Sequence, residues 1–279
     1  MRRTILITGC SSGIGAALAA ELYRRGNRVY ATARRLETLA PLAAMGLDTH
    51  PLDVNDDLGI ATLMSRIEKE GGKLDILINN AGFSQVGAVV DLSREDLRRQ
   101  YETNVIAPIA VTRAALPLLR AARAAHGKAV VANVGSIVGL FTTPFASAYS
   151  SSKAALHSLS DGLRMELAPF GIQVVTVQPG GVQSAFGDHA EAAIRLPADS
   201  VYRPVEKGIR ARAQAGQRGA MPVETFVVPV VDGLLRDAPP AIIRGGKNSI
   251  LLPLLKKLLP LRTFDRLLAK TFGLDHFKP

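Results

Sequence analysis

The sequence has a single cysteine, Cys10, and no tryptophan among its 279 residues. One cysteine excludes an intramolecular disulfide and any cysteine-based metal cluster, and it is typical of a reducing compartment. No group of His, Asp and Glu residues has the spacing of metal ligands, so we expect no metal site.

Long apolar runs are also missing. No stretch approaches the roughly 18–20 consecutive apolar residues that span a bilayer. The apolar run at residues 4–8 ends at Gly9, which makes it too short for the core of a signal peptide. We therefore expect a cytoplasmic protein.

Aromatic residues make up only 5% of the chain, although the formal net charge is +10. A basic protein suggests nucleic acid, but the basic residues form no recognisable DNA- or RNA-reading motif, and we expect no nucleic-acid partner. An anionic cofactor and an anionic lipid surface remain as explanations of the charge.

A glycine-rich turn follows the first apolar run directly. The spacing is G-x-x-x-G-x-G, with Gly9, Gly13 and Gly15 between a short strand and an Ala/Leu-rich helix that ends near Arg25. Glycines let the backbone approach a pyrophosphate, and the helix N-terminus supplies N–H donors. The turn therefore predicts a dinucleotide site, and Cys10 within it is interpreted as a filler rather than a nucleophile.

The second expected strand, Arg28–Ala33, ends in Arg34 and Arg35. NAD-binding units place an acidic residue here to bind the ribose 2′-hydroxyl, whereas a guanidinium binds a 2′-phosphate bidentately. The pair predicts NADP(H) in preference to NAD(H).

Strands and helices alternate along residues 1–245, which predicts one α/β domain. We expect a doubly wound, Rossmann-type parallel sheet of about seven strands with helices on both faces. Ligands of such sheets lie at the carboxyl ends of the strands, where Gly9, Asp53, Asn80 and Ser136 all fall. Asp53, followed by Val54, is placed to accept from an adenine amino group. A long helix is expected from about 94 to 124, with a bend near Pro108 or Pro117.

Tyr149 and Lys153 are four residues apart in a helical pattern, so they share one face. An ammonium beside a phenol favours the phenolate, and this pairing predicts a proton donor or acceptor that works nearer neutrality. Ser136, at the end of the preceding apolar run, can hydrogen-bond the same substrate oxygen.

In order and spacing, these motifs resemble the short-chain dehydrogenase/reductase family: Thr8-Gly9-x-x-x-Gly13-Ile14-Gly15, Asn79-Asn80-Ala81-Gly82, Asn104, Ser136, Tyr149-x-x-x-Lys153 and Pro179-Gly180. The resemblance implies that Tyr149 is the general acid/base, that Lys153 lowers its pKa and binds the nicotinamide ribose, and that Ser136 polarises the carbonyl. Asn104 would hold a water linked to Lys153. The implied cofactor contacts also include Ser11, Ser12, Ala81, Gly82, Pro179, Gly180 and Val182, with Ser184 in the place of a more usual Thr.

Within the family, ATARR, ETNVIAP and VGSIVG resemble the 17β-hydroxysteroid and retinol dehydrogenase branch and its bacterial relatives. This resemblance implies a lipophilic alcohol, ketone or aldehyde as substrate, and a homodimer or homotetramer. Residues 181–222 are irregular and basic, and we expect them to form a substrate lid. The alternative function is a dinucleotide-binding redox sensor or scaffold without turnover.

Residues 246–279 form an amphipathic extension that we expect to contain two short helices. It holds seven Lys or Arg and two Asp, a net +5 that is half the charge of the chain. Three interpretations remain open: packing over the cleft or a partner subunit, an apolar lid that selects lipophilic substrates, and peripheral contact with an anionic membrane. Capping by Thr263 and a stop at Gly273 are expected for the second helix.

Overall fold

The computed structural model describes residues 2–275 and 277, and its core is one parallel sheet of seven strands. The strand order is β3-β2-β1-β4-β5-β6-β7, with a crossover from one half to the other after β3. The predicted doubly wound, Rossmann-type fold with a helical extension is confirmed. The strands are β1 (Thr4–Ile7), β2 (Arg28–Ala33), β3 (Asp48–Pro51), β4 (Ile76–Asn79), β5 (Ala129–Val134), β6 (Ile172–Pro179) and β7 (Ile242–Gly245).

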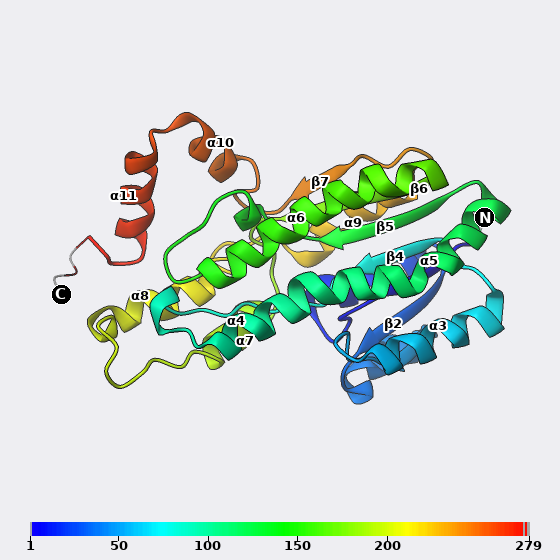
Figure 1. Ribbon diagram of the computed structural model, residues 1–279, viewed down its shortest axis with the longest axis horizontal. Coiled ribbons are helices and arrows are strands. Elements are labelled where there is room, and N and C mark those ends of the chain that lie inside the picture. The colour runs from blue at the N-terminus through cyan, green and yellow to red at the C-terminus, as the bar shows by residue number, and fades with distance from the viewer. Residues whose placement is uncertain (1, 276, 278–279) are drawn as a thin grey trace.

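Helices cover both faces of the sheet (Figure 1). Helices α1 (Gly13–Arg24) and α9 (Val223–Leu235) pack on one face and against each other. Helices α3 (Asp57–Gly71), α5 (Ala107–His126) and α6 (Ser147–Leu167) cover the other face. The loops between these elements also contain a short α-helix and four 3₁₀ turns: α2 (Ala40–Ala44), η1 (Leu36–Leu39), η2 (Val89–Asp91), η4 (Ile137–Gly139) and η5 (Ala168–Phe170).

The central strands are apolar because both of their faces are buried. Every residue of β4 and β5 is buried, including Asn79 and Asn133. The Asn79 amide donates to Asn133 Oδ1 at 2.8 Å and to Thr112 Oγ1 on α5 at 3.0 Å, while the Asn133 amide donates to Ser160 Oγ on α6 at 2.9 Å. Buried polar groups need such partners, and this network fixes α5 and α6 on the strands that carry the site.

The long helix expected at residues 94–124 is interrupted, but not at a proline. Helix α4 (Arg94–Tyr101) runs through a π-helical turn, η3 (Glu102–Ile106), into α5. Pro108 lies just after the π-helical turn, at the beginning of α5, and Pro117 lies inside α5. The irregularity of this helix thus lies at residues 102–106, just before Pro108, and the expected bend near Pro108 or Pro117 stays a prediction.

By length and composition alone, the helical stretch Arg94–His126 is apolar enough to cross a membrane. Half of its most apolar window is buried in the fold, and core helices packed against a sheet pass the same test. We therefore interpret Arg94–His126 as a core helical stretch packed on the sheet.

The segment after β6 is more regular than its sequence suggests. Residues 181–222 contain α7 (Phe186–Ala192), η6 (Arg203–Val205) and α8 (Glu206–Gln214). Side chains of α7 and α8 form an apolar cluster with Phe145 and with Phe272 from the end of the chain. The expectation of an irregular segment is therefore wrong, because two short helices form there and pack into this apolar cluster.

The C-terminal extension forms α10 (Leu251–Leu258) and α11 (Leu261–Thr271). Pro260 precedes α11, so the expected cap at Thr263 is wrong. Phe264 and Leu268 pack on Ile137 and Phe141, which follow β5. Figure 1 shows α7, α8, α10 and α11 gathered at the end of the molecule toward which the strands point. Residues 276, 278 and 279 of the expected extension lie outside the described residues.

Candidate active site

The glycine turn after β1 forms a cradle that side chains would fill. Gly9 and Gly13 have φ of +74° and +59°, a region that favours glycine. A Cβ on Gly9 would lie 2.7 Å from the Cα of Ala81, and a Cβ on Gly15 would clash with the Gly9 carbonyl and the Asn80 amide. No side chain caps the N-terminus of α1, and its N–H groups remain for an anionic ligand. The cradle fits a dinucleotide pyrophosphate.

Hydrogen bonds lock this turn to the end of β4. The Asn80 side chain donates to the carbonyls of Thr8 and Gly9, both at 2.9 Å. Thr8 Oγ1 accepts from the backbone N–H groups of Asn80 and Ala81 at 3.0 Å. Thr8 and Asn80 therefore set the shape of the turn.

The end of β2 presents two exposed arginines. Arg35 lies 3.7 Å from Glu37 in a fully exposed ion pair, and no ion pair of Arg34 is found in the described part of the chain. Asp53, exposed after β3, accepts from the backbone N–H of Asn55 at 3.0 Å. These groups surround the place where the adenosine half of a dinucleotide would lie, and both guanidinium groups are accessible there.

One cavity of about 1620 Å³ joins the two halves of the site. Of the site residues predicted from sequence, all but Thr8 and Asn104 line it. Those that do are Gly9, Ser11, Ser12, Gly13, Ile14, Gly15, Arg34, Arg35, Asp53, Val54, Asn80, Ala81, Gly82, Ser136, Tyr149, Lys153, Pro179, Gly180, Val182 and Ser184.

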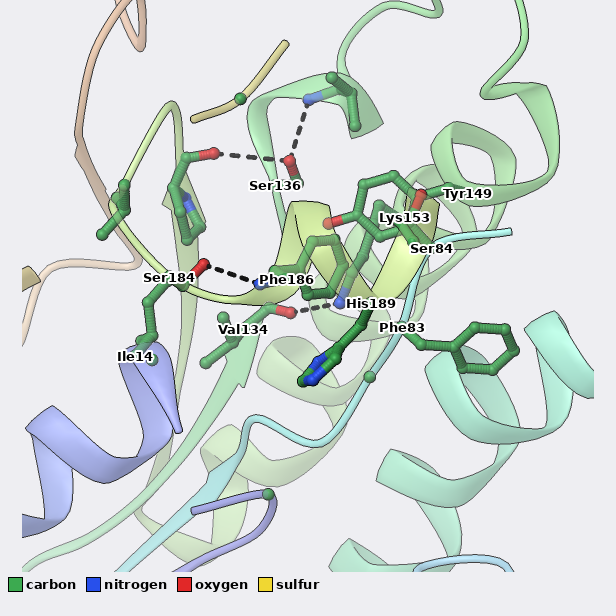
Figure 2. A pocket seen from close by; sticks show the side chains of 18 of the residues that line it. Ile14, Phe83, Ser84, Val134, Ser136, Tyr149, Lys153, Ser184, Phe186 and His189 are labelled. Carbon is green, nitrogen blue, oxygen red and sulfur yellow. Dashed lines mark hydrogen bonds between the residues drawn. The ribbon is translucent and has the colours of Figure 1, made fainter. Parts of the chain in front are cut away.

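Ser136, Tyr149 and Lys153 surround the deep part of this cavity (Figure 2). Lys153 is buried and donates to the carbonyl of Val134 at 2.7 Å, and its ammonium lies 5.9 Å from the centroid of the Tyr149 ring. Ser136 Oγ donates to the carbonyl of Pro179 at 3.5 Å. Ser136 thus comes from the turn that follows β5, and Tyr149 and Lys153 both come from α6.

Burial is the largest influence on the pKa values of Tyr149 and Lys153. It raises the pKa of the Tyr149 phenol, while the Ser136 hydroxyl and the Arg212 guanidinium lower it. Burial also lowers the pKa of Lys153 to about 8. Desolvation of the phenolate outweighs the Ser136 and Arg212 contributions to the Tyr149 pKa, and the lowering of that pKa by Lys153 stays a prediction.

Asn104 lies behind the cavity wall, fully buried in the π-helical turn. Its side chain pairs with the backbone of Phe83, accepting from the N–H at 3.2 Å and donating to the carbonyl at 3.0 Å, and it donates to Ser152 Oγ at 3.1 Å. A Cβ on Gly82 would lie 3.1 Å from Asn104 Oδ1 and 3.6 Å from Lys153 Nζ. Asn104 therefore holds the segment Gly82–Phe83, which follows β4, beside Lys153.

The predicted nicotinamide side connects to the glycine cradle. A Cβ on Gly13 would lie 2.9 Å from the Cβ of Ser184, whose hydroxyl accepts from the N–H of Phe186 at 3.4 Å (Figure 2). The sequence gives Phe186 no role, yet its ring lies 5.6 Å from that of Tyr149.

Other residues of the site carry no sequence signal. His157 accepts from the backbone N–H of Ser136 at 3.4 Å, and burial lowers its pKa to about 4, so its ring is neutral. Its position two turns after Tyr149 on α6 is the only available hint. Arg212 stands out in sequence only as one of several basic residues in the segment 181–222. Burial raises the pKa of Cys10 to about 12, which agrees with a packing role.

No group of three or more potential metal ligands occurs among residues 2–275 and 277. A cradle shaped for a dinucleotide leads directly to a tyrosine that can exchange a proton with a substrate. This combination defines an oxidoreductase on a dinucleotide-binding fold.

Comparison with known proteins agrees with this class. The family model described as short chain dehydrogenase matches residues 3–194. The chain belongs to the short-chain dehydrogenase/reductase family, and it is an enzyme of that family rather than a non-catalytic sensor or scaffold.

Three similar proteins illustrate the relationship. A short-chain dehydrogenase of Penicillium crustosum is 38% identical over 252 residues, covering 89% of this chain and 90% of that one. An NADPH-dependent 1-acyldihydroxyacetone phosphate reductase of Schizosaccharomyces pombe is 37% identical, covering 87% and 79%. A short-chain dehydrogenase of Streptomyces avermitilis has a solved structure with TM-score 0.75 and 32% identity, covering 87% of both chains.

Proposed function

We propose that the enzyme interconverts a lipophilic alcohol with its ketone or aldehyde, uses NADP(H) in preference to NAD(H), and employs Tyr149 as general acid/base. The observation that carries this proposal is the single cavity that Tyr149, Lys153 and Ser136 share with Arg34 and Arg35.

The proposed chemistry needs only a hydride and a proton. The nicotinamide supplies or accepts the hydride when it is bound. In the direction of reduction, the Tyr149 hydroxyl gives its proton to the substrate oxygen, and the Ser136 hydroxyl donates a hydrogen bond to the same atom. Tyr149, whose pKa burial raises, is protonated at neutral pH and so holds the proton that reduction requires. Lys153, held by the Val134 carbonyl, lies at the same wall to bind ribose hydroxyls.

The preference for NADP(H) rests on the end of β2. No acidic residue occupies the position that would bind a ribose 2′-hydroxyl, and Arg34 and Arg35 line the cavity instead. The name of the S. pombe relative states NADPH dependence, which supports the same choice.

The proposed lipophilic substrate rests on the outer wall of the cavity. Phe141, Phe186, Leu252, Leu268 and Phe272 all line it, three of them from the C-terminal extension. The S. pombe relative is named for a ketone with an acyl chain, which supports a lipophilic substrate class. The finer placement in the 17β-hydroxysteroid and retinol dehydrogenase branch remains part of this proposal.

The test is oxidation of NADPH and NADH with a panel of ketones and aldehydes: a steroid ketone, retinal, medium- and long-chain aldehydes, and a short polar ketone. NADPH-dependent turnover of the lipophilic members is expected, and Arg34→Ala should reduce the preference for NADPH over NADH by about tenfold or more. Faster turnover with NADH, or of the polar ketone, would contradict the cofactor or substrate assignment respectively.

The catalytic role of Tyr149 has its own test. Tyr149→Phe removes the proton donor and should lower kcat by at least about 100-fold while NADPH still binds. Tyr101→Phe, on α4 and outside the cavity lining, is the matched control and should retain activity. Equal turnover by Tyr149→Phe and wild type would exclude the proposed acid/base.

A peripheral membrane contact through residues 246–279 is a further part of the proposal. Ile250, Leu258 and Leu261 are 72%, 67% and 62% exposed, and Lys256 and Lys257 adjoin them. Basic amphipathic helices bind anionic bilayers in this way. Sedimentation with phosphatidylserine vesicles should retain the wild type and lose a Leu258→Asp/Leu261→Asp variant; no sedimentation of the wild type would rule out the contact.

Assembly and location complete the proposal. The outer faces of α5 and α6 suit pairing of subunits, and Leu159 and Met165 are exposed apolar residues on α6. We propose a homodimer or homotetramer through these helices, which light scattering would test. Cytoplasmic location is supported by the buried lone thiol of Cys10.

A further inference from the structure

Arg212 on α8 carries a buried charge at the wall of the substrate cavity. Its side chain lines the cavity, and only 9% of the residue is exposed. Its Nε–H donates to Thr143 Oγ1, and its guanidinium lies 5.9 Å from the ring centroid of Phe272. Arg212 is thus held in place by residues from two other segments of the chain.

No counter-ion accompanies this guanidinium in the part of the chain that the structure describes. The nearby acidic residues of α7 and α8 have other partners: Glu206 pairs with Arg210 at 2.7 Å, and Asp188 and Glu191 accept from Gln214 at 2.9 and 2.8 Å. Apart from Nε–H, the Arg212 donors have no acceptor among the described residues. Four N–H groups therefore remain for a ligand.

The environment of Arg212 makes an unpaired charge costly. Burial lowers the pKa of its guanidinium to about 10, and the only opposing influence is the phenol of Tyr149. An anion that enters the cavity would offset the desolvation cost of this buried cation through its charge and its hydrogen bonds. Arg212 and Tyr149 line the same cavity, so a ligand in that cavity can contact both.

The cavity that Arg212 lines also has apolar walls, and the Phe272 ring centroid lies 5.9 Å from the guanidinium. Phe272 and Leu268 come from the C-terminal extension, and Phe186 packs on Tyr149. A planar guanidinium with free donors binds carboxylates and phosphate monoesters bidentately. A neutral lipophilic ligand would leave those donors unpaired, whereas an amphiphilic anion satisfies the donors and the apolar wall together.

We propose that the substrate is an amphiphilic anion whose carboxylate or phosphate monoester binds Arg212 in the cavity that Tyr149 also lines, while its apolar part lies against Phe272 and Leu268. This assignment rests on the proposed function, because it describes the substrate of the same site. It goes further by making Arg212 the residue that determines specificity for the charged end of the substrate.

The first experiment measures binding without turnover. Octanoate, octyl phosphate and octan-1-ol are titrated calorimetrically into the full-length protein saturated with NADP⁺. At least one of the two anions should bind about tenfold or more tightly than the alcohol, as expected for charge-assisted hydrogen bonds. A preference for octanoate or for octyl phosphate identifies a carboxylate or a phosphate as the charged end. Equal affinity for all three probes would overturn the proposal.

Variants separate binding from a structural role. Arg212→Met should remove the preference for the anion and leave octan-1-ol binding unchanged, and Arg212→Lys should retain part of the preference. Arg210→Met is the matched control, because Arg210 is exposed on the same helix and paired with Glu206. Equal weakening of the anion and the alcohol by Arg212→Met would show that Arg212 only supports the fold.

Turnover of matched ketones distinguishes this proposal from the proposed function. The pairs are 3-oxodecanoate with its methyl ester, and the phosphate monoester of 1-hydroxydecan-2-one with the free hydroxyketone. A higher kcat/KM for an anionic member, lost in Arg212→Met, supports both. Reduction of the neutral members alone would overturn the anion subsite and leave the proposed function standing. Anion binding without reduction of any ketone would support the anion subsite and overturn the proposed function.

Discussion

Replacing Lys153 by Met should change how the free energy of unfolding depends on pH, because the buried ammonium of Lys153 is costly to keep charged. Burial lowers the pKa of the Lys153 ammonium from 10.5 to about 8. In the unfolded chain the same ammonium is in water and titrates at its ordinary pKa. Between pH 8 and 10.5 the unfolded state therefore binds a proton that the folded state does not. The free energy of unfolding then rises with pH across this window.

The magnitude follows from the two pKa values. A tenfold change in proton affinity corresponds to about 1.4 kcal/mol, so the whole window is worth about 3 kcal/mol and the span from pH 8 to 9.5 about 2 kcal/mol. Below pH 8 both states are protonated, and the contribution is constant. Lys153→Met removes the pH-dependent part. Loss of the hydrogen bond to the Val134 carbonyl adds an offset that does not change with pH.

Urea unfolding between pH 7 and 9.5 measures this effect. Circular dichroism is the suitable signal because the chain has no tryptophan. The stability of the wild type relative to Lys153→Met should be constant below pH 8 and rise by about 2 kcal/mol up to pH 9.5. Lys69→Met, at an exposed position on α3, is the control and should run parallel to the wild type. Parallel curves for wild type and Lys153→Met would refute the reasoning.

Two substitutions test other parts of the site. Gly15→Ala places a Cβ against the Gly9 carbonyl and the Asn80 amide, so NADPH affinity measured by fluorescence titration should fall at least about tenfold; an unchanged Kd would contradict the cradle. Phe264→Ala removes a side chain that is 1% exposed and should lower the free energy of detaching the C-terminal extension by about 3–5 kcal/mol. The extension should then be cleaved faster by protease, and KM for lipophilic substrates should rise. Leu261→Ala, at an exposed position, is the control and should do neither. Equal protease resistance of both variants would count against this packing.

The sequence predicts the sheet well because its signal is local. Strands buried on both faces read as short apolar runs, and parallel order places their carboxyl ends at one edge. The sequence alone therefore assigns four residues to one site: Gly9, Asp53, Asn80 and Ser136. Tyr149 and Lys153 follow from helical spacing alone.

The substrate half of the site could not be predicted in this way. Arg212 is buried because Thr143 and Phe272, each about 60–70 residues away in sequence, close around it. Nothing in the composition of α8 separates it from the exposed Arg210. The raised pKa of Tyr149 likewise depends on burial, which spacing does not reveal. The π-helical turn at Glu102–Ile106 has no signal in helix propensity and depends on the buried contacts of Asn104.

That π-helical turn also sets the phase between two helices. One added residue in an α-helix rotates everything beyond it by about 100° around the axis. Residues of α4 such as Glu95, Arg98 and Arg99 can therefore face the cavity while α5 keeps its apolar stripe on the sheet. A deletion of one residue within 102–106 would restore an ordinary helix, but it would turn that charged rim away from the ligand. The length of this turn therefore decides whether α4 presents its charged residues to the cavity.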